Sequence, residues 1–191
     1  MVFGEIAGKM AKKIIAENVH DRIVATEFDT AVKSCVERIA TVTMVTNEQK
    51  ISLSEIKKEL QKINEKCLSV LRSEKLLSEA VVRLNQLYDD LKNVVIANKS
   101  LFWNEELVNY FEIENLLLNS LAATYSALSR KESRGAHYRN DYVNRDDENW
   151  LCHSVIAANE EVTQEWHYKI RAVNTSSEIA QLNLTPMRRK Y

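Results

Sequence analysis

The chain has 191 residues, of which 28% are charged, and its net charge is −1. It contains only 3 glycines and 1 proline, where average usage gives about 13 and about 10, so the sequence predicts long helices and few tight turns. The balanced charge argues against a nucleic-acid-binding domain, which usually carries an excess of basic residues. No apolar stretch reaches the roughly 18 residues of a membrane-inserted helix.

Two amphipathic segments open the chain. Within residues 5–18, Ile6, Met10 and Ile14 recur every four residues. Within residues 28–42, Phe28 and Val32 begin a similar repeat. This spacing places the apolar side chains on one face of a helix, so each segment is predicted to be helical.

Three further helices are predicted from residue 52 onward. Ser52 and Glu55 form a capping-box pattern at the start of the first. Ser73 is expected to cap the second, which is either a separate helix or a kinked continuation of the first. Asn104 is expected to cap the third, which is the longest.

The third helix is predicted to end near Ser133, because Gly135 offers the left-handed backbone that commonly follows a helix. The expected fold is all-α: an antiparallel three-helix bundle over residues 21–135, with an irregular C-terminal extension over residues 136–191. Within that extension a short strand is expected around residues 166–173.

Two groups of side chains could carry chemistry. His137, Arg139 and Asp141 are either an acid–base and substrate-binding set or a structural ion-pair network, and we favour the network. Cys152 and His153 are sequence neighbours, which seldom converge on one reacting atom.

The remaining candidates are weaker still. His20 and His167 lie in polar, unpatterned sequence and are expected on the surface. The three cysteines are widely spaced, with no CxxC pair, which argues against a zinc site or a disulfide framework. We therefore expect no catalytic, cofactor-binding or metal-binding residue in this chain.

Residues 130–151 hold five basic and five acidic side chains and carry the most specific pattern. Glu132–His137, Arg139, Asp141–Tyr142 and Arg145–Leu151 closely resemble the C-terminal signature of succinate dehydrogenase and fumarate reductase flavoprotein subunits. Weaker resemblance runs through Val2–Gly8, Leu60–Leu76, Leu107–Leu117 and Pro186–Tyr191. Val143 departs from the family, which usually has proline there. We assign a structural or interface role to Glu132, Ser133, Arg134, Gly135, His137, Arg139, Asp141, Arg145, Asp146, Asp147 and Trp150.

The resemblance implies a spectrin-like bundle and makes residues 1–20 the helical end of a flavin-binding domain. It implies that the parent protein, not this chain, binds FAD, oxidises succinate to fumarate and passes electrons to an iron–sulfur subunit. The implied partners are the flavin-binding domain and that subunit. The implied location is peripheral, on the cytoplasmic side of a bacterial inner membrane. The alternatives are the C-terminal domain of an L-aspartate oxidase and a free-standing helical interaction module.

Replacing Arg134 with alanine tests for a buried network. We expect a loss of stability larger than the roughly 0.5 kcal/mol typical of surface changes, because a buried carboxylate such as Asp141 or Asp146 would lose its partner. Thermal melting measures this loss. A melting temperature equal to that of the unmodified chain would argue against a buried network.

Overall fold

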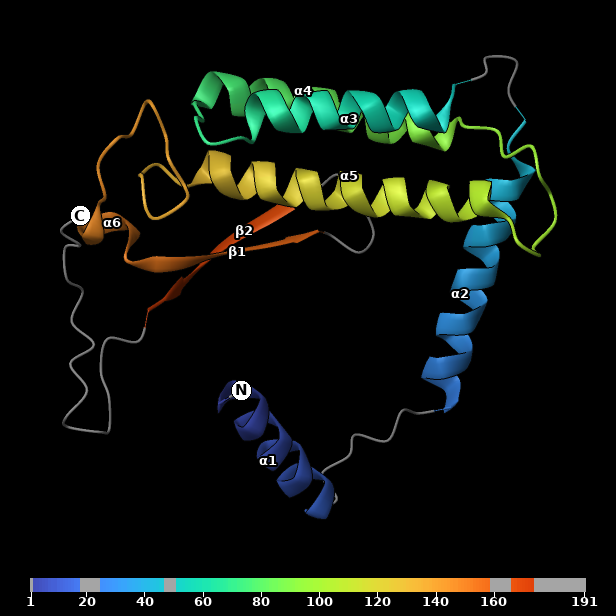
Figure 1. The fold of residues 1–191 in the computed structure, drawn as a ribbon, viewed down its shortest axis with the longest axis horizontal. Coiled ribbons are helices and arrows are strands. Elements are labelled where there is room, and N and C mark those ends of the chain that lie inside the picture. Colours follow the sequence, from blue (N-terminus) through green and yellow to red (C-terminus); the bar gives the residue numbers. More distant parts are fainter. Residues whose placement is uncertain (1, 18–24, 47–50, 159–165, 174–191) are drawn as a thin grey trace. The chain divides into compact units, whose positions relative to one another are not determined.

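The computed structural model describes residues 2–17, 25–46, 51–158 and 166–173, and these ranges fall into two compact units. The first unit, Met1–Met44, contains helices α1 (Val2–Ala16) and α2 (Ala25–Met44), shown in blue in Figure 1. Both amphipathic segments are therefore helical, as predicted. On α1 the apolar side chains of Ile6, Met10 and Ile14 are exposed.

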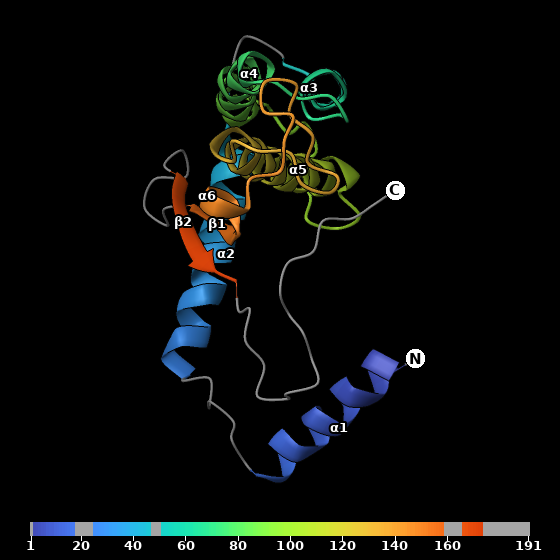
Figure 2. The same cartoon turned by 90° about the vertical axis from the view of Figure 1, so that its left-hand side faces the viewer.

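The second unit is built on three helices: α3 (Leu53–Cys67), α4 (Glu74–Lys92) and α5 (Glu105–Ser129). Each of the three contacts the other two. Figure 1 shows successive helices running in opposite directions. Figures 1 and 2 show α3 and α4 side by side against α5. Fully buried leucines, among them Leu77, Leu84, Leu117 and Leu121, fill the space between the helices. The three helices predicted from residue 52 onward therefore pack together, whereas the predicted all-α class holds only in part, because two strands follow them.

The predicted helix starts are also confirmed. Ser52 and Glu55 form a complete capping box at α3. The Ser73 hydroxyl accepts from the amide of Leu76, and the Asn104 side chain accepts from the amide of Leu107. Helices α3 and α4 are separate rather than one kinked helix.

Residues between α3 and α4 bond with a distant segment, which explains the break. The amide of Arg72 donates to the Tyr138 carbonyl at 3.3 Å, and the amide of Asn140 donates to the Arg72 carbonyl at 2.8 Å. These two bonds hold Arg72 in an extended bridge beside Arg139. The backbone groups of Arg72 are thus bonded to another segment instead of continuing a helix.

The predicted end of the third helix is wrong. Helix α5 ends at Ser129, and Arg130 already has an extended backbone with φ −87° and ψ 107°. Gly135 does have a left-handed φ of 60°, but it is the first central residue of a two-residue turn. Arg134 and His137 flank that turn and exchange backbone hydrogen bonds of 2.8 and 3.1 Å. Glycine at this place is typical of a type II′ turn.

The expected irregular extension is also partly wrong, because it contains regular structure. A short helix, α6 (Asp147–Trp150), leads into an antiparallel hairpin of β1 (Cys152–Ala158) and β2 (Trp166–Ala172). Strand β2 was expected and β1 was not. Both strands contact α5 (Figure 1). The rings of Trp166 on β2 and Tyr125 on α5 stack with centroids 5.9 Å apart.

The hairpin has an outward face that carries polar side chains. His153 pairs with Arg171 across the strands, and Ala157 pairs with His167. Both histidines are exposed, which confirms the surface position expected for His167. His20 lies outside the described residues. None of the helices in the described ranges is long and apolar enough to span a bilayer.

Candidate functional site

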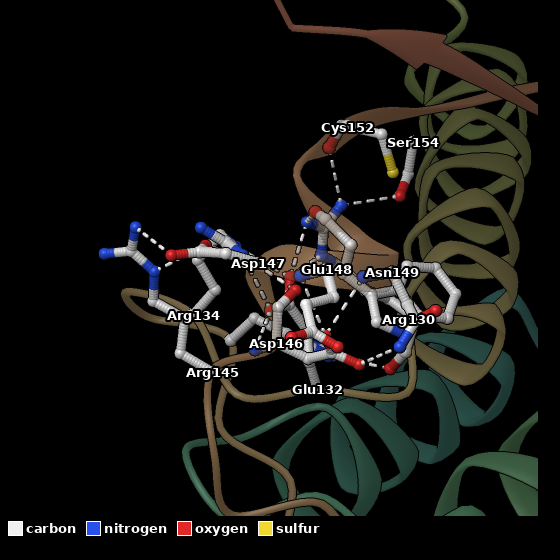
Figure 3. A network of polar contacts seen from close by, with 12 residues as sticks. Arg130, Glu132, Arg134, Arg145, Asp146, Asp147, Glu148, Asn149, Cys152 and Ser154 are labelled. Atoms are coloured by element: carbon white, nitrogen blue, oxygen red, sulfur yellow. Dashed lines mark hydrogen bonds and ion pairs between the residues drawn. The ribbon is translucent and has the colours of Figure 1, made fainter. Parts of the chain in front are cut away.

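Glu132 lies at the centre of a polar network just beyond the end of α5, and its side chain has no solvent exposure. One carboxylate oxygen accepts from Arg130 and from Arg134 Nε at 2.7 Å. The other accepts from Arg134 Nη2 at 2.9 Å and from the Asp146 amide at 3.0 Å (Figure 3). Burial alone would raise the pKa of the Glu132 carboxyl, but these donors outweigh burial and hold the pKa below its ordinary value.

Arg130 connects α5 to the segment that follows. Its guanidinium donates to the carbonyls of Trp150 at 2.6 Å and Cys152 at 3.1 Å, and to the Ser154 hydroxyl at 2.9 Å. It also lies 5.6 Å from the centre of the Trp150 ring. One side chain thus fixes the end of α6 and the start of β1 against the end of α5.

A more exposed layer surrounds Glu132. Asp147 accepts from Arg145 and Arg134 at 2.7 Å each, and these hydrogen bonds lower the pKa of its carboxyl to about 2. Asp146 caps α6 by accepting from the amides of Glu148 and Asn149. The expectation that Arg134 pairs with Asp141 or Asp146 is wrong, since its carboxylate partners are Glu132 and Asp147.

Arg139 and Asp141 form a second, bidentate pair with N–O distances of 2.7 and 2.8 Å. Arg139 is fully buried and also donates to the carbonyls of Ala127 and Leu128, at the end of α5. Asp141 accepts from the amide of Glu74, the first residue of α4, at 2.7 Å. Arg139, followed by the other donors, holds the pKa of the Asp141 carboxyl far below its ordinary value.

Ser133 organises the loop between the two pairs. Its hydroxyl accepts from the Arg139 amide at 2.9 Å and donates to the Tyr142 carbonyl at 2.7 Å. Its own amide donates to the Asn144 carbonyl. The loop thereby closes on itself, which brings both charged pairs to the same end of the bundle.

His137 is half-buried and both of its ring nitrogens are bonded. Nε2 faces the Arg130 carbonyl at 3.2 Å, and since a carbonyl only accepts, Nε2 carries the hydrogen. Nδ1 then accepts from Arg72 Nη1 at 3.1 Å. Burial, followed by the nearby arginines, lowers the pKa of His137 and favours the neutral ring.

These contacts test the two groups of side chains that could carry chemistry, namely His137 with Arg139 and Asp141, and Cys152 with His153. His137 bonds to Arg72 and Arg130, whereas Arg139 and Asp141 bond to each other, so the three do not converge on a shared point. Cys152 and His153 lie on opposite faces of β1, where Cys152 is half-buried and His153 is exposed. Among the described residues, no group of three His, Cys, Asp or Glu side chains could hold a metal ion.

Two arginines of the network, Arg130 and Arg72, were not predicted from the sequence. Arg130 was counted only as a charge, although it is the residue directly after α5. Arg72 lies directly before the helix cap Ser73, a position that gives little hint of a contact with residue 137. Both contacts depend on how the chain folds back, which local sequence does not reveal.

Replacing Glu132 with glutamine should lower the free energy of unfolding by about 3–5 kcal/mol, because two guanidinium groups would lose their shared buried counter-charge. Urea denaturation measures the change. Glu148→Gln is the matched control, since Glu148 is exposed, and its effect should stay within about 0.5 kcal/mol. Equal effects of the two substitutions would contradict the central role of Glu132.

The lowered pKa of His137 predicts a loss of stability on mild acidification. Between about pH 7 and 5 the unfolded chain gains a proton at this histidine, while the folded chain resists it, so stability falls. Carboxyl groups contribute to a similar fall only near and below about pH 4. His137→Gln should flatten the melting temperature between pH 7 and 5, whereas His153→Gln should not; unchanged slopes in both variants would contradict the prediction.

Comparison with known proteins adds to this geometry. Residues 57–191 match a family model described as the fumarate reductase flavoprotein C-term. A succinate dehydrogenase flavoprotein subunit of Rickettsia bellii is 30% identical over 191 residues, which cover 100% of this chain and 31% of that protein. A fumarate reductase flavoprotein subunit of Helicobacter pylori is 41% identical over 105 residues, which cover 55% of this chain and 15% of that protein.

Solved structures share the fold. A quinol fumarate reductase of E. coli aligns with a TM-score of 0.76 at 23% identity, covering 97% of this chain and 32% of that one. An adenylylsulfate reductase of Archaeoglobus fulgidus aligns with a TM-score of 0.65 at 23% identity, covering 90% and 28%. The chain spans less than a third of the length of each of these four relatives. By the family match, the chain belongs to the C-terminal domain family of succinate dehydrogenase and fumarate reductase flavoprotein subunits.

Proposed function

We propose that this chain is a structural domain of a succinate dehydrogenase or fumarate reductase flavoprotein and that it takes no direct part in the reaction. FAD, the dicarboxylate substrate and the reacting side chains would then belong to a flavin-binding domain of the same protein. The observation that carries this proposal is the engagement of the polar groups at residues 130–151. Glu132, Arg139 and both nitrogens of His137 are bonded within the domain.

Helix α1 is expected to pack on a partner surface. The exposed apolar stripe of α1, formed by Ile6, Met10 and Ile14, is typical of a helix that packs on another surface. We propose that this surface is the flavin-binding domain and that residues 1–20 are its helical end. The iron–sulfur subunit that accepts electrons from the flavin would be the second partner. The complex would lie peripherally on the cytoplasmic side of a bacterial inner membrane.

The purified 191-residue chain provides the first test. We expect no flavin absorbance and no reduction of an electron-accepting dye by succinate, because the chain would lack the cofactor and the reacting residues. Stoichiometric FAD or succinate-dependent turnover would refute the supporting role.

The reading frame upstream of Met1 provides the second test and separates the alternatives. We expect it to encode a flavin-binding domain, and the extended protein to bind FAD and reduce the dye with succinate. Turnover with L-aspartate instead would identify an L-aspartate oxidase. An upstream stop codon, with no flavin-binding domain in the frame, would favour a free-standing interaction module.

A further inference from the structure

An open depression of about 450 Å³ lies at the network end of the second unit, between α5 and β1. Three arginines line it, namely Arg72, Arg130 and Arg134, together with His137 and His153. None of the lining residues is an aspartate or a glutamate. A wall with several cations and no anion is suited to a negatively charged group.

Arg72 has hydrogen-bonding capacity left over. It is half-buried, and no carboxylate is within ion-pair distance of it among the described residues. Nε and Nη2 donate to the Leu68 carbonyl, and Nη1 donates to His137. A guanidinium has five N–H groups, so one hydrogen on each terminal nitrogen has no acceptor in the described part of the chain.

The other two arginines differ from each other. All five N–H groups of Arg130 are used, on Glu132, Trp150, Cys152 and Ser154. Arg134 donates through Nε and Nη2 only, so its Nη1 adds two hydrogens without an acceptor in the described ranges. Of the three arginines, Arg72 and Arg134 therefore have N–H groups available to a ligand in the depression.

The charge of the depression limits what it can hold. Asp147 is shared between Arg134 and Arg145, so Arg145 is counted with the three lining arginines. These four arginines face three carboxylates, Glu132, Asp147 and the adjoining Asp146, which leaves about one positive charge in excess. A carboxylate, with a charge of −1, matches this excess better than a phosphate, whose charge near pH 7 is about −1.5 to −2. The planar guanidinium group also fits the two oxygens of a carboxylate.

We propose that the depression binds a carboxylate group, with Arg72 as its principal ligand and Arg134 Nη1 as the second donor. The carboxylate could belong to a small free acid or to an acidic side chain of a neighbouring protein segment, since both present the same two oxygens. The depression lies wholly within this chain, so the proposal holds whether or not the chain is part of a flavoprotein.

An NMR titration of the isotope-labelled 191-residue chain at constant ionic strength tests the proposal. The probes are succinate, N-acetylglutamate N-methylamide and inorganic phosphate. We expect carboxylate binding in the roughly millimolar range, with signal shifts centred on residues 72, 130, 134 and 137. Equal affinity for succinate and N-acetylglutamate N-methylamide would indicate a binding site for a single acidic side chain. An approximately tenfold preference for succinate would indicate a site for a free dicarboxylate.

Two variants and a control make the result specific. Arg72→Gln should weaken carboxylate binding at least about tenfold by removing the principal ligand. Ala123→Phe should also abolish the shifts, because Ala123 is an exposed residue of α5 that lines the depression and a larger side chain would fill it. Arg83→Gln should leave binding unchanged, since Arg83 lies on α4 outside the depression and pairs with Glu59.

Three results would overturn the proposal. The first is the absence of shifts around residues 72 and 134 with either carboxylate. The second is shifts that persist in both Arg72→Gln and Ala123→Phe. The third is phosphate binding about tenfold tighter than carboxylate binding, which would show that the depression selects a different anion.

Discussion

The buried carboxylate of Glu132 sets the arrangement of the whole C-terminal end of this domain. Removing a carboxylate from water is costly, and the cost is offset only when its oxygens are filled with well-placed donors. Arg130, Arg134 and the amide of Asp146 provide those donors. Because Arg130 also bonds to Trp150, α6 and β1 take their positions from the same carboxylate. Glu132 thus connects the bundle to the segment that follows it.

The Arg139–Asp141 pair connects the end of α5 to the start of α4. Arg139 contacts the carbonyl end of α5, where the helix dipole is negative, and Asp141 contacts the amide end of α4, where it is positive. Each charge therefore stabilises one helix end and the two ends are tied to each other. The same contacts leave these groups without a free position for chemistry, which agrees with a supporting role in a larger flavoprotein.

Local features of this fold could be predicted from the sequence, and features that depend on distant contacts could not. Ser52, Ser73 and Asn104 cap helices within three residues of themselves, so their patterns sufficed. The end of α5 was predicted too late in the chain, because the positive φ expected of Gly135 was taken for the end of the helix. The helix ends earlier, at Ser129, and Arg130 bonds to Trp150 about twenty positions later, a contact that local sequence does not show. Strand β1 was not predicted because its extended conformation depends on pairing with β2, and strand propensity alone is a weak signal. The ion pairs Arg134–Glu132 and Arg139–Asp141 could not be predicted either, because they depend on how the turn at residues 134–137 folds the chain back.

Native-state hydrogen exchange at the amide of Asp146 tests the central role of Glu132 most directly. This amide lies in a loop but donates to the buried carboxylate of Glu132. If the network and the bundle form one cooperative unit, the amide should exchange with the same free energy as those of Leu84 and Leu117 in the bundle core. Exchange at the rate of an open loop, while the core amides stay protected, would contradict the account.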